Sequence, residues 1–120
     1  MNHIGLCEGR HEIKTNKGES VNDFVFHKVE NPLDFDSHET VVNKWLNGRK
    51  AMLTSLSRSD EPLYLYVTGL TSLLVAFLNQ WNHLQRLSNS PLPSLVLMHY
   101  DRDSEQYQPQ KTICQTWVAY

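Results

Sequence analysis

Two short polar segments carry the residue types that could bind a phosphate group. The first is Thr68-Gly69-Leu70-Thr71-Ser72 and the second is His99-Tyr100-Asp101-Arg102-Asp103. A helix beginning near Leu70 would leave its first amide groups unpaired and the positive end of its dipole facing a ligand. Gly69 would let that ligand approach the backbone closely, and neighbouring hydroxyls would add donors. We therefore predict ligand contacts at Thr68, Gly69, Thr71 and Ser72. The alternative is that Thr71 or Ser72 only caps the helix.

The second segment could supply catalytic and recognition groups. His99 has a reference pKa near neutrality and could act as general acid or base, although a satisfied core histidine is the simpler interpretation. Arg102 could pair with a phosphate as a planar fork, unless it pairs with a neighbouring aspartate in the turn. Tyr100, together with Tyr107, could stack on a base or pack within a hairpin. We predict His99 and Arg102 as catalytic residues and Tyr100 as a ligand contact.

Cofactor and metal chemistry receive little support from the sequence. The Thr68–Ser72 turn lacks both the Gly-x-x-x-x-Gly-Lys and the Gly-x-Gly-x-x-Gly patterns, which argues against ATP hydrolysis and ordinary dinucleotide binding. Asp101 and Asp103 next to His99 are of the types that bind divalent metals, but acidic turns are common. We expect neither a metal nor a cofactor.

Residues 1–23 are polar and show little periodicity. The simplest interpretation is a solvated, loose N-terminal arm. The alternative is that Arg10 and His11 fold over the ligand edge and contribute to binding.

A βαβ unit would bring the two polar segments together. The run Leu63–Thr68 is apolar and aromatic, as in a buried strand, and apolar residues then recur at helical spacing from Leu70 to Leu84. A second apolar strand covers Leu95–Tyr100. The two strands should be parallel with a right-handed connection. Ligands of parallel sheets bind beyond the carboxyl ends of the strands, where both polar segments would lie.

The remaining elements predict a small Rossmann-like α/β fold with a mixed sheet and one domain over residues 1–120. Phe24–Phe26 is a short strand candidate. A helix should begin at Asp36, with Glu39 as its capping-box partner, and end at Asn47-Gly48. A second helical piece should cover Arg49–Leu56. The last strand should be Thr112–Val118, antiparallel to Leu95–Tyr100 at the edge of the sheet.

Composition limits the classes of partner. The 120-residue chain has 11 basic and 13 acidic residues and a formal net charge of −2, which argues against duplex nucleic acid as a partner. No apolar run is long enough to cross a bilayer, and no signal peptide is evident. Two cysteines, without metal-type spacing, favour free thiols in a reducing compartment, so we expect a cytoplasmic protein without a membrane partner.

The Leu63–Thr68 strand, the turn after it and the strand ending at His99-Tyr100-Asp101-Arg102 together resemble a known family. They are similar to the CRISPR-associated Rossmann-like domains of the CARF and ring-nuclease group, many of which have a Thr-Gly-Gly-Thr-like turn after a core strand. Leu70 stands here in place of the second glycine. The resemblance covers about forty of the 120 residues. It implies an antiviral-defence protein that holds a cyclic oligonucleotide at Gly69, Thr71 and Ser72, usually across a dimer.

Two hypotheses of function follow. The first is a protein that binds a phosphate-bearing nucleotide at the Gly69/His99 edge and could cleave a phosphodiester without metal, with His99 moving the proton. The alternative is a non-enzymatic factor of a phage or mobile element that captures a host protein by strand addition at Thr112–Val118. Both hypotheses are compatible with a homodimer.

Overall fold

The computed structural model describes residues 2–9, 11–87 and 91–112. Five strands form one sheet in the order β2-β1-β3-β4-β5. Their bounds are His3–Cys7 (β1), Phe24–Phe26 (β2), Leu63–Tyr66 (β3), Leu95–Asp101 (β4) and Gln106–Lys111 (β5). Strands β1 to β4 are mutually parallel, and β5 pairs with β4 antiparallel. This mixed α/β architecture is compatible with a small Rossmann-like fold.

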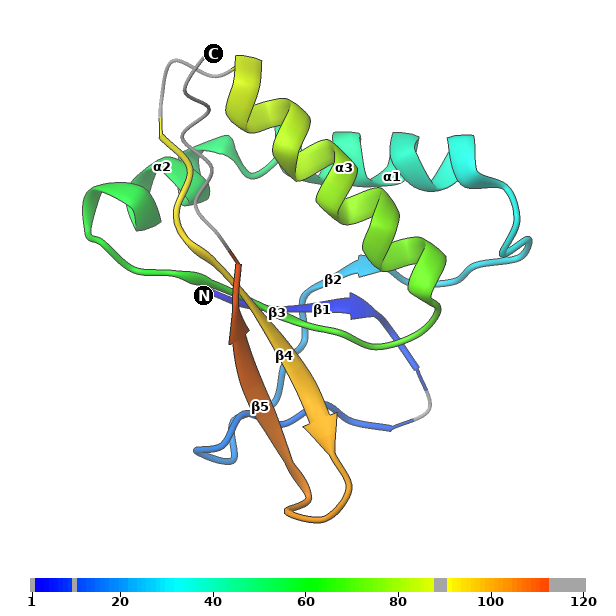
Figure 1. Cartoon of the computed structure of the whole chain (residues 1–120), viewed down its shortest axis with the longest axis vertical. Coiled ribbons are helices and arrows are strands. Elements are labelled where there is room, and N and C mark those ends of the chain that lie inside the picture. The colour runs from blue at the N-terminus through cyan, green and yellow to red at the C-terminus, as the bar shows by residue number, and fades with distance from the viewer. Residues whose placement is uncertain (1, 10, 88–90, 113–120) are drawn as a thin grey trace.

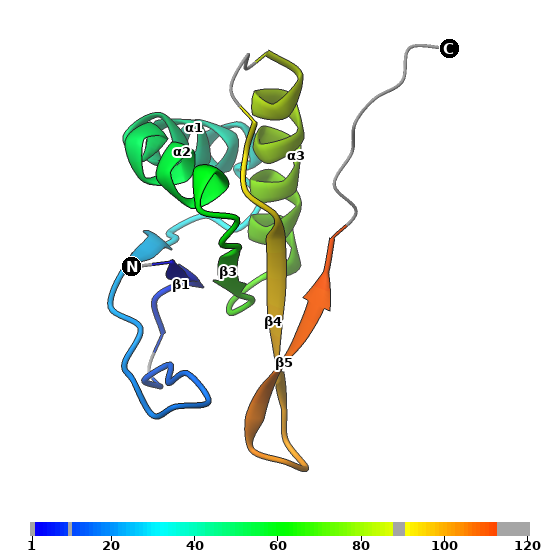
Figure 2. The same ribbon diagram turned by 90° about the vertical axis from the view of Figure 1, so that its left-hand side faces the viewer.

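Three helices gather on one side of the sheet. They are α1 (Phe35–Asn47), α2 (Lys50–Arg58) and α3 (Thr71–Leu87). Figure 1 shows them above the strands, while the blue segment that joins β1 to β2 lies on the other side. Figure 2 shows the β4–β5 hairpin projecting away from the helices. One face of the sheet is therefore covered by helices and the other by the connection through residues 8–23.

Strand alternation accounts for the core on the helical side. Successive side chains of a strand point to opposite faces. One set of alternate residues packs against the helices and is buried: Ile4, Leu6, Leu63, Leu65, Leu95 and Leu97. The helices pack against these strand residues through apolar side chains at helical spacing. Among them are Val42, Leu53, Leu73 and Phe77, which are at most 1% exposed.

The other set of alternate residues forms what we call the helix-free face. Residues opposite one another in register share a face. The "His3 row" crosses four strands as His3, Tyr64, Val96 and Lys111, and the "Gly5 row" beside it is Gly5, Tyr66, Met98 and Pro109. Beyond them lies the "tyrosine pair", Tyr100 opposite Tyr107. These rows are the floor on which any ligand of this face would lie.

The central βαβ prediction is confirmed in its main feature. Strands β3 and β4 pair in parallel, with Tyr64 opposite Val96, and α3 joins them. The observed β3 ends at Tyr66 rather than at Thr68, and α3 begins at Thr71. Both polar segments therefore follow strands at the same edge of the sheet.

The cap of α1 differs from the prediction. Asp34, rather than Asp36, precedes the helix, and its Oδ1 accepts a hydrogen bond from the Ser37 amide at 3.2 Å. Asp36 lies within the first turn. A cap must stand outside the helix so that its side chain can reach the free amide groups. The helix itself, the second helix at Lys50–Arg58 and the short strand Phe24–Phe26 were all predicted near their observed positions.

The interpretation of residues 1–23 as a solvated arm is wrong for β1. This strand lies between β2 and β3, and its Ile4 and Leu6 are fully buried. The mid-strand Gly5 hid the pattern, because glycine is unfavourable in strands. Glycine is needed at position 5 for a steric reason. A Cβ there would stand 2.4 Å from the Phe24 ring, which covers that position on the helix-free face.

The edge strand was predicted too late in the chain. The sequence predicted an edge strand only from Thr112 onward, yet the structure forms β5 at Gln106–Lys111. The predicted strand Thr112–Val118 lies outside the described residues except for Thr112, whose amide donates to the Leu95 carbonyl at 3.1 Å. The expected antiparallel placement against β4 is confirmed for β5. No helix in the described part of the chain is long and apolar enough to cross a membrane.

Candidate functional site

A cavity of about 900 Å³ opens at the carboxyl ends of the parallel strands, on the helix-free face. It brings together the turn after β3 and the end of β4, which are about thirty residues apart in sequence. Five of the predicted ligand-edge residues line it: His11, Thr68, Gly69, Tyr100 and Arg102. The edge location expected for a parallel sheet is therefore the location of a real cavity.

The turn after β3 is fixed by contacts within the protein. The Thr68 hydroxyl donates to the Cys7 carbonyl at 2.7 Å and accepts from the Cys7 amide at 3.2 Å, so it ties β3 to β1. Gly69 has φ +85°, and a Cβ there would stand 2.9 Å from the Cys7 Cβ. The Thr68 hydrogen bonds and the close approach of the Gly69 backbone both involve Cys7. Thr68 and Gly69 therefore shape the wall of the cavity and would reach a ligand mainly through their backbone.

Arg102 is the cation at the end of β4. It makes no hydrogen bond or ion pair with any residue in the described part of the chain. The turn aspartates do not hold it: Asp101 accepts from the Asp103 amide at 3.1 Å and from the Ser104 hydroxyl at 2.9 Å. These hydrogen bonds lower the pKa of Asp101. Because Asp101 is committed to the turn, the Arg102 guanidinium is available to an anionic ligand.

Two tyrosines form the aromatic wall. The Tyr100 and Tyr107 rings lie 5.3 Å apart at 65°, and Tyr107 in turn meets the buried Tyr66 edge-on at 4.9 Å. Burial raises the pKa of Tyr107. Tyr100 is 53% exposed although it lies on β4. Its ring offers a flat surface on which a nucleobase could stack.

The remaining wall comes from the connection between β1 and β2. Lys14 pairs with Ser20 in an isolated antiparallel bridge, and Ile13 and Val21 are buried against the sheet. We call residues 11–21 the cover loop. Its cavity-lining residues include His11, Glu12 and Lys14, and the Lys14 ammonium lies 4.0 Å from Glu12.

The prediction that His11 folds over the ligand edge agrees with this placement, whereas Arg10 lies outside the described residues. Sequence reasoning missed Lys14 and the cover loop as a whole. The available signal was the pair of apolar residues Ile13 and Val21 on either side of the polar Asn16-Lys17-Gly18 turn.

Three predicted site residues do not line the cavity: Thr71, Ser72 and His99. Tyr100 faces the cavity, so strand alternation turns His99 to the opposite face, where its Nε2 lies 2.7 Å from Gln110 Oε1. Ser72 donates to the Pro32 carbonyl at 3.3 Å, toward the loop before α1. The Ser72 hydroxyl and the His99 imidazole are therefore engaged away from the group formed by Gly69, Tyr100 and Arg102.

Acidic residues complete the lining. Glu8, Glu12 and Glu105 face the same cavity as the cations. Among the described residues, no group of three His, Cys, Asp or Glu side chains could hold a metal ion. Cys7 also lines the cavity, and burial raises the pKa of its thiol, which favours the unreactive protonated form. The lining thus combines charged, hydrogen-bonding and aromatic side chains.

No protein-family model, curated protein or solved structure matches this chain.

Proposed function

We propose that this protein binds a phosphate-bearing nucleotide in the carboxyl-edge cavity. The observation that carries the proposal is the pairing of an uncommitted guanidinium, Arg102, with an exposed aromatic ring, Tyr100, in one cavity. Those two groups match the two ends of a nucleotide. The guanidinium would bind phosphate oxygens as a fork, and the tyrosine ring would stack on the base.

Other lining groups fit the same ligand. Lys14, whose ammonium lies 4.0 Å from Glu12, adds a second cation to the lining, His11 adds an imidazole, and the backbone at Gly69 adds polar contacts. The carboxylates of Glu8, Glu12 and Glu105 can accept hydrogen bonds from the exocyclic amino group of adenine or cytosine. The volume of about 900 Å³ is near the upper end of the range for small-molecule sites, about 300–1,000 Å³. A linear or cyclic oligonucleotide would use that space better than a mononucleotide.

Cleavage of the bound ligand is a separate part of the hypothesis. A general base must come within hydrogen-bond reach of the proton that it removes. His99 faces away from the cavity, whereas His11 lines it. We therefore propose binding as the function. We treat metal-independent phosphodiester cleavage as an additional activity for which His11 is the better-placed histidine.

A thermal-shift screen against AMP, linear oligoadenylates and cyclic oligoadenylates, with and without Mg²⁺, tests the proposal. A ligand that binds the folded state raises the melting temperature by mass action. We expect nucleotide to raise the melting temperature of the wild-type protein. Arg102→Gln should weaken the apparent affinity for that nucleotide about tenfold, because a charge-assisted contact is lost. Arg58→Gln on the exposed side of α2 is the matched control and should leave the shift unchanged. No shift at millimolar nucleotide would contradict the proposal.

The same samples test cleavage. Chromatography of the nucleotide after incubation in EDTA separates intact from cleaved ligand. Loss of cleavage in His11→Gln, together with normal cleavage in His99→Gln, is the expected pattern if the protein is a phosphodiesterase. Unchanged ligand in all samples would reject the enzymatic part and leave binding intact.

The predicted alternative, partner capture by strand addition at Thr112–Val118, falls outside the described residues beyond Thr112. Strand addition at the neighbouring β5 meets an obstacle. The Met98 carbonyl accepts from Val67 on the β3 side, so Pro109, opposite Met98, directs its ring nitrogen toward the open edge of the sheet. A proline there removes a donor that an added strand would need. We therefore favour the nucleotide proposal over strand addition at β5.

A further inference from the structure

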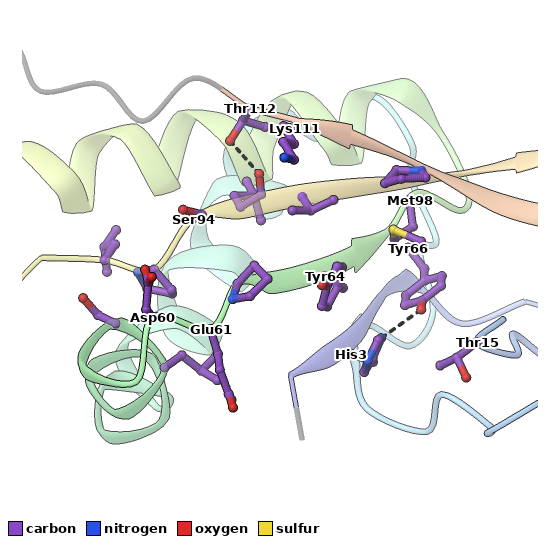
Figure 3. Close-up of a pocket in the computed structure, with 18 of the residues that line it drawn as sticks. His3, Thr15, Asp60, Glu61, Tyr64, Tyr66, Ser94, Met98, Lys111 and Thr112 are labelled. Atoms are coloured by element: carbon purple, nitrogen blue, oxygen red, sulfur yellow. Dashed lines mark hydrogen bonds between the residues drawn. The ribbon is translucent and has the colours of Figure 1, made fainter. Parts of the chain in front are cut away.

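A second cavity, of about 1,040 Å³, lies on the helix-free face at the other side of the cover loop. Its floor is the His3 row together with Tyr66 and Met98. Figure 3 shows Tyr64, Tyr66 and His3 near one end of this floor, with Lys111 and Thr112 above it. Thr15 and Asn16 of the cover loop line both cavities, so this loop divides the helix-free face into two compartments.

The floor of this cavity is aromatic and rigid. The His3 and Tyr64 rings are stacked at 4.8 Å and 8°, and His3 Nδ1 lies 2.8 Å from the Tyr66 hydroxyl. Val96 and Met98 add apolar surface beside these rings, and three prolines line the walls: Pro62, Pro93 and Pro109. A floor of this kind suits an apolar or aromatic side chain, because burial of apolar surface drives binding and stacked rings stay in place.

Opposite charges stand on different walls. Asp60 and Glu61 come from the connection between α2 and β3, whereas Lys111 is the last residue of β5. Figure 3 shows the two acidic residues at the end of α2 and Lys111 across the floor from them. None of these three side chains makes an ion pair or hydrogen bond with a residue in the described part of the chain. The cover loop adds Lys17 and Glu19, whose formal charges cancel.

We propose that this cavity binds a short peptide with free termini and an apolar or aromatic side chain. The peptide's ammonium group would pair with Asp60 and Glu61, its carboxylate with Lys111, and its side chain would lie on the Tyr64 surface. A peptide fits better than a free amino acid, because the complementary charges stand on separate walls and the cavity is large. This site is distinct from the nucleotide cavity, and neither proposal depends on the other.

Isothermal titration calorimetry with the tripeptide Ala-Tyr-Ala tests the proposal. Three further probes remove one or both terminal charges: the N-acetylated, the C-amidated and the doubly blocked tripeptide. We expect the unblocked peptide to bind and each block to weaken binding about tenfold, because a hydrogen-bonded charge contact is lost. No heat of binding at millimolar unblocked peptide, or equal affinity for all four probes, would overturn the proposal.

Two variants test which residues of the cavity walls bind each terminus of the peptide. Lys111→Met should abolish the preference for a free carboxylate over the amide and keep the preference for a free amino terminus. Asp60→Asn combined with Glu61→Gln should do the reverse. All three residues are exposed, so both variants should fold. If the preferences survive these substitutions, the assignment of the walls is wrong.

A matched variant separates the two cavities. Arg102→Gln removes the cation of the nucleotide cavity and should leave peptide affinity unchanged. Tyr64→Leu should weaken the unblocked peptide, and the melting temperature of the free variant reports whether it folds. Loss of peptide binding in Arg102→Gln would place the peptide in the other cavity and overturn the proposal.

Discussion

The two faces of the sheet differ in what covers them. On one face, three helices bury the strand residues in a continuous apolar core. On the other, the cover loop packs on the sheet in a smaller cluster of Ile13, Val21, Tyr66, Val96 and Met98. The loop protects the middle of that face and leaves a cavity on each side of it. We infer that the helical face supplies most of the stability, while the helix-free face has the concave, chemically mixed surface that ligands need.

Matched core truncations give the largest expected difference between the faces. Leu65 lies under the helices and is fully buried, whereas Met98 lies under the cover loop and is 6% exposed. Leu65→Ala should lower the free energy of unfolding by about 4 kcal/mol and Met98→Ala by about 2 kcal/mol. The helices cannot collapse into the new cavity, whereas a loop can adjust. Urea denaturation measures both values, and equal losses would break the contrast between the faces.

A substitution at Gly69 tests whether the packing of the turn after β3 against Cys7 stabilises the carboxyl-edge cavity. Gly69→Ala should lower the free energy of unfolding by about 2–3 kcal/mol, since it combines a positive φ with a Cβ 2.9 Å from Cys7. Gly18 has φ +82° and nothing within 4 Å of a Cβ, so Gly18→Ala isolates the backbone cost, about 1 kcal/mol. Chemical denaturation compares the two variants. If Gly69→Ala is no worse than Gly18→Ala, the contact with Cys7 does not constrain the turn.

The helix layer also depends on the cap at Asp34. Asp34→Ala should destabilise the protein by about 1 kcal/mol, because the free Ser37 amide loses its acceptor. Asp36→Ala is the matched control within the first turn and should cost less, about 0.3–0.5 kcal/mol, through the helix dipole alone. Thermal denaturation in low salt resolves the difference. A larger loss of stability in Asp36→Ala than in Asp34→Ala would support Asp36 as the cap, as predicted from the sequence.

The smallest expected effect is a pH dependence on the helix-free face. Burial, followed by the charge of the N-terminus, lowers the pKa of His3 below its usual 6.5. The unfolded chain then takes up a proton before the folded protein does. The stability associated with neutral His3 is therefore complete above pH 6.5 and is lost as the pH falls toward the lowered pKa. His3→Gln should flatten the decline in stability as the pH falls below 6.5. An unchanged slope in urea titrations would contradict this role.

The sequence predicts the helical face better than the helix-free face for a physical reason. The strands β3 and β4 and helix α3 bury apolar residues at regular spacing, so their pattern is visible in one dimension. Strand β5, by contrast, is Gln-Tyr-Gln-Pro-Gln-Lys, mostly exposed, and only pairing with β4 makes it a strand. The short β1 is interrupted by Gly5, which the sequence cannot connect with the Phe24 ring that covers it.

The candidate site shows the same limit. The parallel-sheet rule correctly brought Gly69 and Arg102 to one edge, because it needs only the order and direction of strands. It did not separate Tyr100 from His99: alternation places neighbours on opposite faces, but the rule does not tell which face of the strand carries the cavity. Ile13 and Val21 on either side of a turn were a local signal for the cover loop, but their contacts with the sheet are long-range and do not follow from that local pattern.

Chemical-shift mapping tests the central claim, that the helix-free face binds a nucleotide at the carboxyl-edge cavity. Amide spectra of ¹⁵N-labelled protein would be recorded while AMP, a linear diadenylate or a cyclic oligoadenylate is added. The account predicts saturable shifts at Gly69, Tyr100 and Arg102, with little change at Phe77 in the helical core. Shifts confined to other regions, or none at millimolar nucleotide, would contradict it.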